Sequence, residues 1–152
     1  MAKTALVTGA SSGIGREIAR DLSARGFRVI ISARREERLR ELAKELGDNT
    51  RVIVCDVSDR EECLRLYEET KNEKISVLVN CAGFGAVGSF DELPLDTELK
   101  MIDTNVTAVH MLTKLFLKDF VAADRGYIMN IASSAGLMYC LLYTSPSPRD
   151  TR

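Results

Sequence analysis

Short apolar runs alternate with amphipathic segments along most of the chain. The runs are apolar throughout rather than at every second position, which is typical of strands covered on both faces. Five of them occur in order: Ala5–Val7, Val29–Ile31, Val52–Val54, Val77–Val79 and Ile128–Ile131. This pattern predicts five strands, each buried between two layers.

The intervening segments carry apolar side chains at helical spacing. The first two predicted helices present Ile14, Ile18 and Leu22, and then Leu39, Leu42, Ala43 and Leu46. Gly26 and Gly47 follow these stripes and are natural helix ends.

The third and fourth helical segments have their own start signals. Ser58 and Glu61 stand in capping-box spacing and predict the start of the third helix. Asp96 is the expected N-cap of the fourth and longest helix. The predicted apolar stripe of that helix consists of Leu99, Ile102, Val106 and Val109.

Strand–helix alternation of this kind implies parallel strands joined by right-handed crossovers, with helices on both faces. We therefore expect an α/β fold with a Rossmann-type doubly wound parallel sheet and strand order 3-2-1-4-5.

Composition narrows the class of protein. The chain has 152 residues, a one-domain length, with 45% hydrophobic and 28% charged residues and a net charge of -1. This balance provides no basic surface for nucleic acid or for an anionic membrane. No apolar run reaches membrane-spanning length, and the start lacks the apolar stretch of a secretory signal. We therefore expect a cytoplasmic protein with no nucleic-acid or membrane partner.

The cysteines do not predict a metal site. Cys55, Cys63, Cys81 and Cys140 show no CxxC spacing and no metal-ligand pattern. Cys55 and Cys81 fall at the ends of strand-like runs, so we expect buried, inert thiols.

A glycine-rich turn directly follows the first predicted strand. A backbone that turns sharply from strand to helix needs glycine, and a diphosphate must approach bare N–H groups at the helix start. The turn has neither GxGxxG spacing nor the Gly-Lys-Ser/Thr of a P-loop, and a tight strand–helix connection is the alternative interpretation. Its candidate cofactor-binding residues are Gly9, Ser11, Ser12, Gly13, Ile14 and Gly15.

The same turn carries a family resemblance. Thr8–Gly15 reads TGASSGIG and matches the TGxxxGIG signature of short-chain dehydrogenases/reductases. The resemblance covers residues 1 to 139, approximately, and further landmarks follow in order.

The end of the second strand bears on the choice of dinucleotide. An acid there would accept hydrogen bonds from a 2′-hydroxyl, whereas a basic group would pair with a 2′-phosphate. By resemblance, Ala33 occupies the position of the acid in NAD enzymes, and Arg34 follows it. The hypothesis is therefore NADP(H), with Arg34 as the main 2′-phosphate clamp and Arg35 as a second candidate. Solvated charges at a helix start are the alternative.

Two further landmarks line the expected cofactor path. Asp56 and Val57 follow the third strand, where the family's aspartate bonds the adenine amino group. Asn80, Ala82 and Gly83 resemble the family's NNAG motif, with a cysteine in place of its second asparagine. A helix N-terminal acid is the alternative interpretation of Asp56.

The resemblance also implies catalytic residues. Asn105 matches the asparagine of the long fourth helix, and Ser133 matches the serine whose hydroxyl bonds the substrate oxygen. Ser134 is the alternative serine. His110, the only histidine, is expected to be an ordinary helix-face residue.

The family's YxxxK motif has no counterpart here. Tyr139 and Tyr143 are too close to Ser133, and no lysine follows Lys118. We therefore expect the C-terminal strands and helices to be missing, leaving an unpaired apolar edge at the fifth strand and an inactive fragment.

The tail supports the same expectation. Residues 140–150 resemble a translated sequencing adapter, and Pro146 and Pro148 oppose a helix. We expect a partial dinucleotide-binding domain over residues 1–139 and a non-native or disordered tail over 140–152. A naturally truncated or diverged protein is the alternative.

For the intact parent protein the resemblance implies an NADP(H)-dependent oxidoreductase that interconverts a carbonyl and an alcohol. Its partner would be a small-molecule substrate, and the parent would be a homodimer or homotetramer. A non-catalytic NADP-binding module or pseudoenzyme is the alternative function. A sugar epimerase or dehydratase is disfavoured by the glycine spacing.

Overall fold

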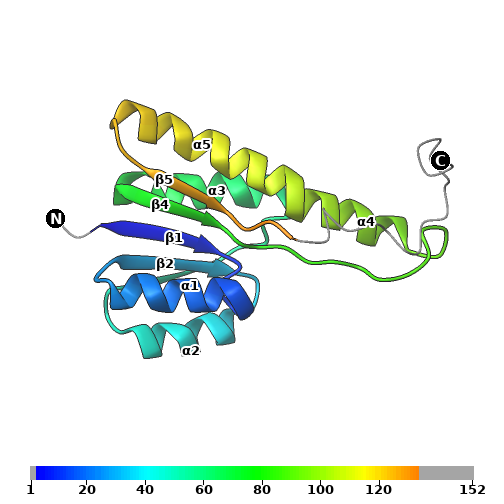
Figure 1. Ribbon diagram of the computed structural model, residues 1–152, viewed down its shortest axis with the longest axis horizontal. Helices are drawn as coiled ribbons and strands as arrows, with labels where there is room; N and C mark the ends of the chain where they lie inside the picture. The colour runs from blue at the N-terminus through cyan, green and yellow to red at the C-terminus, as the bar shows by residue number, and fades with distance from the viewer. Residues whose placement is uncertain (1–2, 134–152) are drawn as a thin grey trace, which may run out of the picture.

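Five parallel strands form one sheet in the computed structural model of the chain, which describes residues 3–133. The strand order is β3-β2-β1-β4-β5 (Figure 1). The strands are β1 (Thr4–Thr8), β2 (Arg28–Ala33), β3 (Thr50–Val54), β4 (Ile75–Asn80) and β5 (Tyr127–Asn130). Each expected strand is present, and the predicted doubly wound order is confirmed.

Helices cover both faces of the sheet (Figure 1). They are α1 (Gly13–Ala24), α2 (Glu36–Leu46), α3 (Arg60–Thr70), α4 (Leu95–Ile102) and α5 (Ala108–Ala122). A short 3-10 turn (Lys71–Glu73) follows α3, and a π-helical segment (Asp103–Thr107) joins α4 to α5.

Alternate residues of the strands supply two separate cores. Val7 and its neighbours pack beneath α1 and α2, whereas Leu6 and its neighbours pack beneath α3 and α5. In the second core, the Tyr67 and Phe116 rings meet edge to face with centroids 5.2 Å apart. Burial on both faces explains why the inner strands are apolar without alternation.

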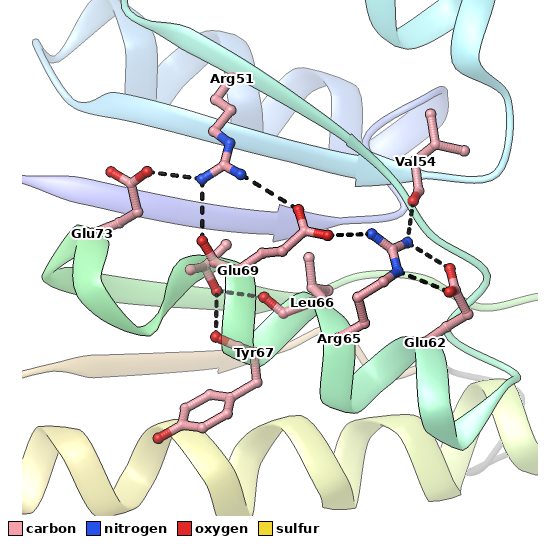
Figure 2. Close-up of polar contacts among 9 residues, drawn as sticks. Arg51, Val54, Glu62, Arg65, Leu66, Tyr67, Glu69 and Glu73 are labelled. Atoms are coloured by element: carbon pink, nitrogen blue, oxygen red, sulfur yellow. Dashed lines mark hydrogen bonds and ion pairs between the residues drawn. The ribbon is translucent and has the colours of Figure 1, made fainter.

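Arginine–glutamate pairs cover the edge of the sheet at β3 (Figure 2). Arg51 Nη1 donates to Glu73 Oε1 at 2.8 Å, and its Nη2 donates to Glu69 Oε2 at 3.4 Å. Arg65 Nη1 donates to Glu69 Oε1 at 2.5 Å. Arg65 Nη2 also donates to the Val54 carbonyl at 2.7 Å, so α3 supplies a partner for a backbone group of the edge strand.

β5 forms the opposite edge of the sheet. It pairs with β4, and no strand within residues 3–133 pairs with its other side. Tyr127 is 74% exposed and Met129 is 49% exposed. The expectation that all five strands are buried is therefore wrong for β5.

Two predicted helix starts need correction. The N-cap of α3 is Asp59, whose Oδ1 accepts from the Glu61 N–H at 2.8 Å, and not Ser58. The Ser58 hydroxyl instead donates to Asp56 Oδ1 at 2.7 Å, and Asp59 is the residue that directly precedes α3. The N-cap of α4 is Pro94 rather than Asp96, which lies in the first turn of the helix.

The predicted stripe of the fourth helix is also wrong. Leu99, Ile102 and Val106 are exposed. The face that packs on the sheet is formed by Thr104, Ala108, Leu112, Phe116 and Phe120. The physical reason is that no residue of α4 is buried, and the helix contributes to the core only from Thr104 onward.

The predicted boundary at residue 139, the adapter-like tail, Ser134, Tyr139 and Tyr143 lie outside the described residues. Among the helices of residues 3–133, none combines the length and the apolar character needed to cross a bilayer.

Candidate functional site

The turn after β1 requires glycine at two positions. Gly9 has φ +70°, and a Cβ built there would lie 2.7 Å from the Ala82 backbone nitrogen. A Cβ on Gly15 would lie 2.6 Å from the Gly9 carbonyl oxygen. Real Cβ atoms do not come this close to backbone, so the predicted turn is held tightly between β1, α1 and the end of β4.

The N-terminus of α1 faces the same edge of the sheet. Its N-cap, Ser12, makes no side-chain capping hydrogen bond. Gly13 has φ +54°, and nothing within 4 Å would meet a Cβ there. Ile14 is 60% exposed, which corrects its assignment to the buried stripe, because Gly15 is the residue of this turn that packs against Gly9. Backbone donors at an open helix start can bind an anion.

Arg35 joins the end of β2 to this turn. Its Nη2 donates to Ser11 Oγ at 2.9 Å and to Ser12 Oγ at 2.7 Å, and its Nε donates to Ser11 Oγ at 3.2 Å. The structure thus brings a predicted phosphate-binding arginine together with two predicted serines. A positive charge lies beside the helix start.

Arg34 points instead toward the end of β3. Its Nη1 lies 3.9 Å from Asp56 Oδ2, and Lys100 Nζ from α4 lies 3.6 Å from the same oxygen. Asp56 Oδ1 accepts from the Ser58 N–H and hydroxyl. Burial raises the pKa of Asp56, but the Ser58 hydrogen bonds and the two cations outweigh it, so that the pKa is lowered. The side chain that caps α3 is Asp59 and not Asp56.

The Thr8 side chain joins the ends of β1 and β4, a role that the sequence pattern did not indicate. Its Oγ1 donates to the Val79 carbonyl at 3.3 Å and accepts from the N–H groups of Cys81 (3.1 Å) and Ala82 (3.3 Å). This hydroxyl therefore fixes the end of β4 against the end of β1. The signal that could have found it is a threonine as the last strand residue before the glycine turn.

Asn80 faces the interior rather than the open edge. Asn80 is only 3% exposed. Its Nδ2 donates to Thr113 Oγ1 at 3.1 Å and to Asn130 Oδ1 at 2.9 Å. The amide holds the ends of β4 and β5 against α5. Val57 is likewise buried, and its carbonyl accepts from the Cys63 thiol at 3.2 Å.

Asn105 lies in the π-helical segment and contacts the loop after β4. Its Oδ1 accepts from the Phe84 N–H, and its Nδ2 donates to the Phe84 carbonyl. A Cβ on Gly83 would lie 3.1 Å from Asn105 Oδ1, so the loop passes close to this amide. The predicted residues Gly83 and Asn105 are therefore neighbours.

Ser133 lies beyond the end of β5, at the same edge of the sheet, and is exposed. The Ile131 N–H donates to the Asn80 carbonyl at 2.9 Å, which keeps the segment after β5 beside β4. Open α/β sheets bind ligands at this edge.

The remaining titratable candidates are the cysteines and the single histidine. Cys55 is buried as expected, and Cys63 is buried as well; burial raises the pKa of Cys55 to about 12 and that of Cys63 to about 11. Cys81 is only half-buried, so the expected burial is wrong for this residue. His110 is exposed on α5, as expected of a helix-face residue. Within residues 3–133, no group of three His, Cys, Asp or Glu side chains could hold a metal ion.

Comparison with known proteins gives a consistent result. Residues 3–145 match the family described as short chain dehydrogenase. The 3-oxoacyl-acyl-carrier-protein reductase of Rickettsia prowazekii is 38% identical over 135 residues, which are 89% of this chain and 55% of that protein. The chain spans about half to three fifths of the length of the first curated relatives it matches.

Solved structures resemble the fold closely. An actinorhodin polyketide ketoreductase variant with NADPH superposes with a TM-score of 0.85 at 39% identity, covering 92% of this chain and 56% of that one. A metagenomic short-chain oxidoreductase in complex with NADP gives a TM-score of 0.82 at 34% identity, covering 86% and 62%.

Proposed function

Because the chain belongs to the short chain dehydrogenase family, we propose that it is the cofactor-binding part of an NADP(H)-dependent oxidoreductase. The whole protein would interconvert a carbonyl and an alcohol of a small-molecule substrate. Relatives named as 3-oxoacyl-acyl-carrier-protein and ketoacyl reductases support this reaction class.

The observation that carries the proposal is the glycine turn of β1 and α1. The backbone of the turn is pressed against β4 at Gly9, the start of α1 has no side-chain cap, and Arg35 lies over the two serines. These features fit a dinucleotide diphosphate, which needs close backbone N–H donors and a nearby positive charge.

The residues around the ends of β2 and β3 favour the phosphorylated dinucleotide. Position 33 is alanine, whereas a carboxylate there would repel a 2′-phosphate. Arg34 follows it and lies beside the end of β3. Asp56 would meet the adenine amino group. The two solved relatives named above, bound to NADPH and to NADP, support the same choice.

The cofactor, when bound, supplies or accepts the hydride. The Ser133 hydroxyl would hydrogen-bond the substrate oxygen where negative charge develops. Asn105 would act by holding the Phe84 backbone, and hence the adjoining Gly83, at the strand ends. Ala82 and Gly83 would line the path of the cofactor ribose.

Direct titration tests the cofactor proposal. The full chain of 152 residues and its Arg34→Ala variant are titrated with NADPH and with NADH by calorimetry. We expect the variant to lose NADPH affinity by about tenfold or more while NADH affinity stays unchanged, because only NADPH carries the 2′-phosphate. Equal losses for both cofactors would remove Arg34 as the clamp. No binding of either dinucleotide by the wild-type chain would overturn the proposed function.

Activity is tested on the whole protein. Ser133→Ala should lower kcat for NADPH-dependent ketone reduction by about 10²–10³-fold if its hydroxyl stabilises the developing charge. Ser134→Ala is the matched control and should leave kcat near its original value. The opposite result would assign the role to Ser134.

A further inference from the structure

A surface cavity opens between the end of β2 and the first turns of α4. Its volume is about 340 Å³, and it is lined by Arg34, Phe84, Asp96, Thr97 and Lys100. The Phe84 backbone is fixed by Asn105, so one wall of the cavity is anchored. Residues far apart in the sequence thus converge beside the proposed phosphate clamp.

Lys100 and Arg34 share one partner. Lys100 Nζ lies 3.6 Å and Arg34 Nη1 lies 3.9 Å from the same oxygen, Asp56 Oδ2. The other carboxylate oxygen of Asp56 accepts from Ser58. Both cations therefore lie on the same side of one carboxylate.

These ion pairs are loose. Charge-assisted N–H···O contacts are normally about 2.7–2.9 Å long, and the two distances are well above that. The Arg34 and Lys100 side chains are 58% and 47% exposed, so their attraction to Asp56 is weak in water and can be given up at small cost.

The lining of the cavity carries a net positive charge, because Arg34 and Lys100 contribute two positive charges against the single carboxylate of Asp96. The Asp56 carboxylate lies outside the lining and keeps its negative charge, but it offers only one oxygen, Oδ2, to the two cations. A phosphate monoester carries a charge of about −1.5 to −2 at neutral pH, and its oxygens can accept from both cations together.

We propose that Lys100 is a specificity-determining residue that binds the 2′-phosphate of NADP(H) together with Arg34. The inference rests on the proposed function and extends it to α4, which the strand-end motifs do not include. The two cations that lie beside Asp56 Oδ2 would then both contact the 2′-phosphate.

The test compares Lys100→Gln with Lys114→Gln, a control on α5 where the lysine is also exposed. Binding of NADPH and NADH to the full chain is measured by calorimetry at constant salt. We expect Lys100→Gln to weaken NADPH by about tenfold and to leave NADH unchanged, because one charged contact to the phosphate is lost. Lys100→Arg should restore most of the NADPH affinity, and Lys114→Gln should match the wild type for both cofactors.

The outcomes separate a failure of the Lys100 proposal from a failure of the proposed function. Equal weakening of NADPH and NADH would place Lys100 at the adenine and overturn the proposal. A Lys100→Gln variant with unchanged affinity for both cofactors would overturn the proposal as well. The proposed function would still stand in that case if the wild-type chain binds NADPH more tightly than NADH. Circular dichroism spectra of the variants exclude loss of folding as the cause. A wild-type chain that binds neither dinucleotide would overturn the proposed function and this inference together.

Discussion

The Asn105 side chain and the Phe84 backbone form a reciprocal pair of hydrogen bonds. The Phe84 N–H donates to Asn105 Oδ1 at 3.1 Å, and Asn105 Nδ2 donates to the Phe84 carbonyl at 2.8 Å. The pair uses the acceptor and one donor of the same amide and joins the loop after β4 to the π-helical segment. Position 105 therefore requires an amide, and not simply a polar side chain.

Asn105→Ala should lower the free energy of unfolding by about 1–2 kcal/mol, because both hydrogen bonds to Phe84 are lost. Asn105→Asp keeps an acceptor but loses the donor, so it should also destabilise the fold. Thr107→Ala changes the same segment without altering the Phe84 contact and is the control. Urea denaturation gives all three values, and an Asn105→Ala midpoint equal to that of wild type would contradict the expected role.

Gly9→Ala should destabilise the fold by about 2–5 kcal/mol, because it adds a clash with the Ala82 backbone to an unfavourable positive φ. Gly26→Ala is the matched control, since Gly26 also has a positive φ (+81°) but no neighbour within 4 Å of a Cβ. The control should lose only about 1–2 kcal/mol. Thermal unfolding of both variants separates the cost of the clash with Ala82 from the cost of the positive φ. Equal losses of stability in the two variants would show that the close approach of Gly9 to Ala82 does not matter.

Thr8→Val should lower the free energy of unfolding by about 1–3 kcal/mol, because the Cys81 and Ala82 N–H groups lose their acceptor. Thr8→Ser keeps the hydroxyl and should retain most of the stability. Thr4→Val, at the other end of β1, makes a similar change in a buried strand position. A Thr4→Val loss as large as that of Thr8→Val would mean that the strand, and not the hydroxyl, accounts for the effect.

Stability should fall at alkaline pH through the buried thiols. The ordinary thiol pKa is 9.0, and burial raises it in the folded chain to about 12 for Cys55 and about 11 for Cys63. The unfolded chain therefore releases these protons first. The stabilisation is complete below the unfolded pKa and is lost as pH rises from there toward the folded values.

Urea denaturation between about pH 8 and about pH 11 measures this slope. The double variant Cys55→Ala and Cys63→Ala should show a shallower decline than wild type, whatever its stability at neutral pH. Identical slopes would show that the thiols do not contribute to the pH dependence.

Much of the fold followed from the sequence because of the burial of the inner strands. β1, β2 and β4 are covered on both faces, so their apolar runs are continuous and easily recognised. The glycine turn was equally clear, since Gly9 and Gly15 are required by contacts that no other residue permits.

Other features depend on contacts between distant parts of the chain. The stripe from Leu99 to Val109 was assigned to a core-facing helix, but no residue of α4 is buried, and only its place in the assembled fold reveals this. The approach of Lys100 to Asp56 has no local signal, because the two residues belong to α4 and to the turn after β3. Hydrogen bonding by Thr8 depends in the same way on the register of β1 against β4.

The unequal edges of the sheet have a consequence for how the molecule is built during synthesis. β1 lies at the centre, and later strands are added outward on either side of it. On the β3 side, Arg65 of α3 occupies the Val54 carbonyl of the edge strand. The strands synthesised after α3, β4 and β5, are added on the other side of β1, so the sheet is completed from its β3 edge to its β5 edge.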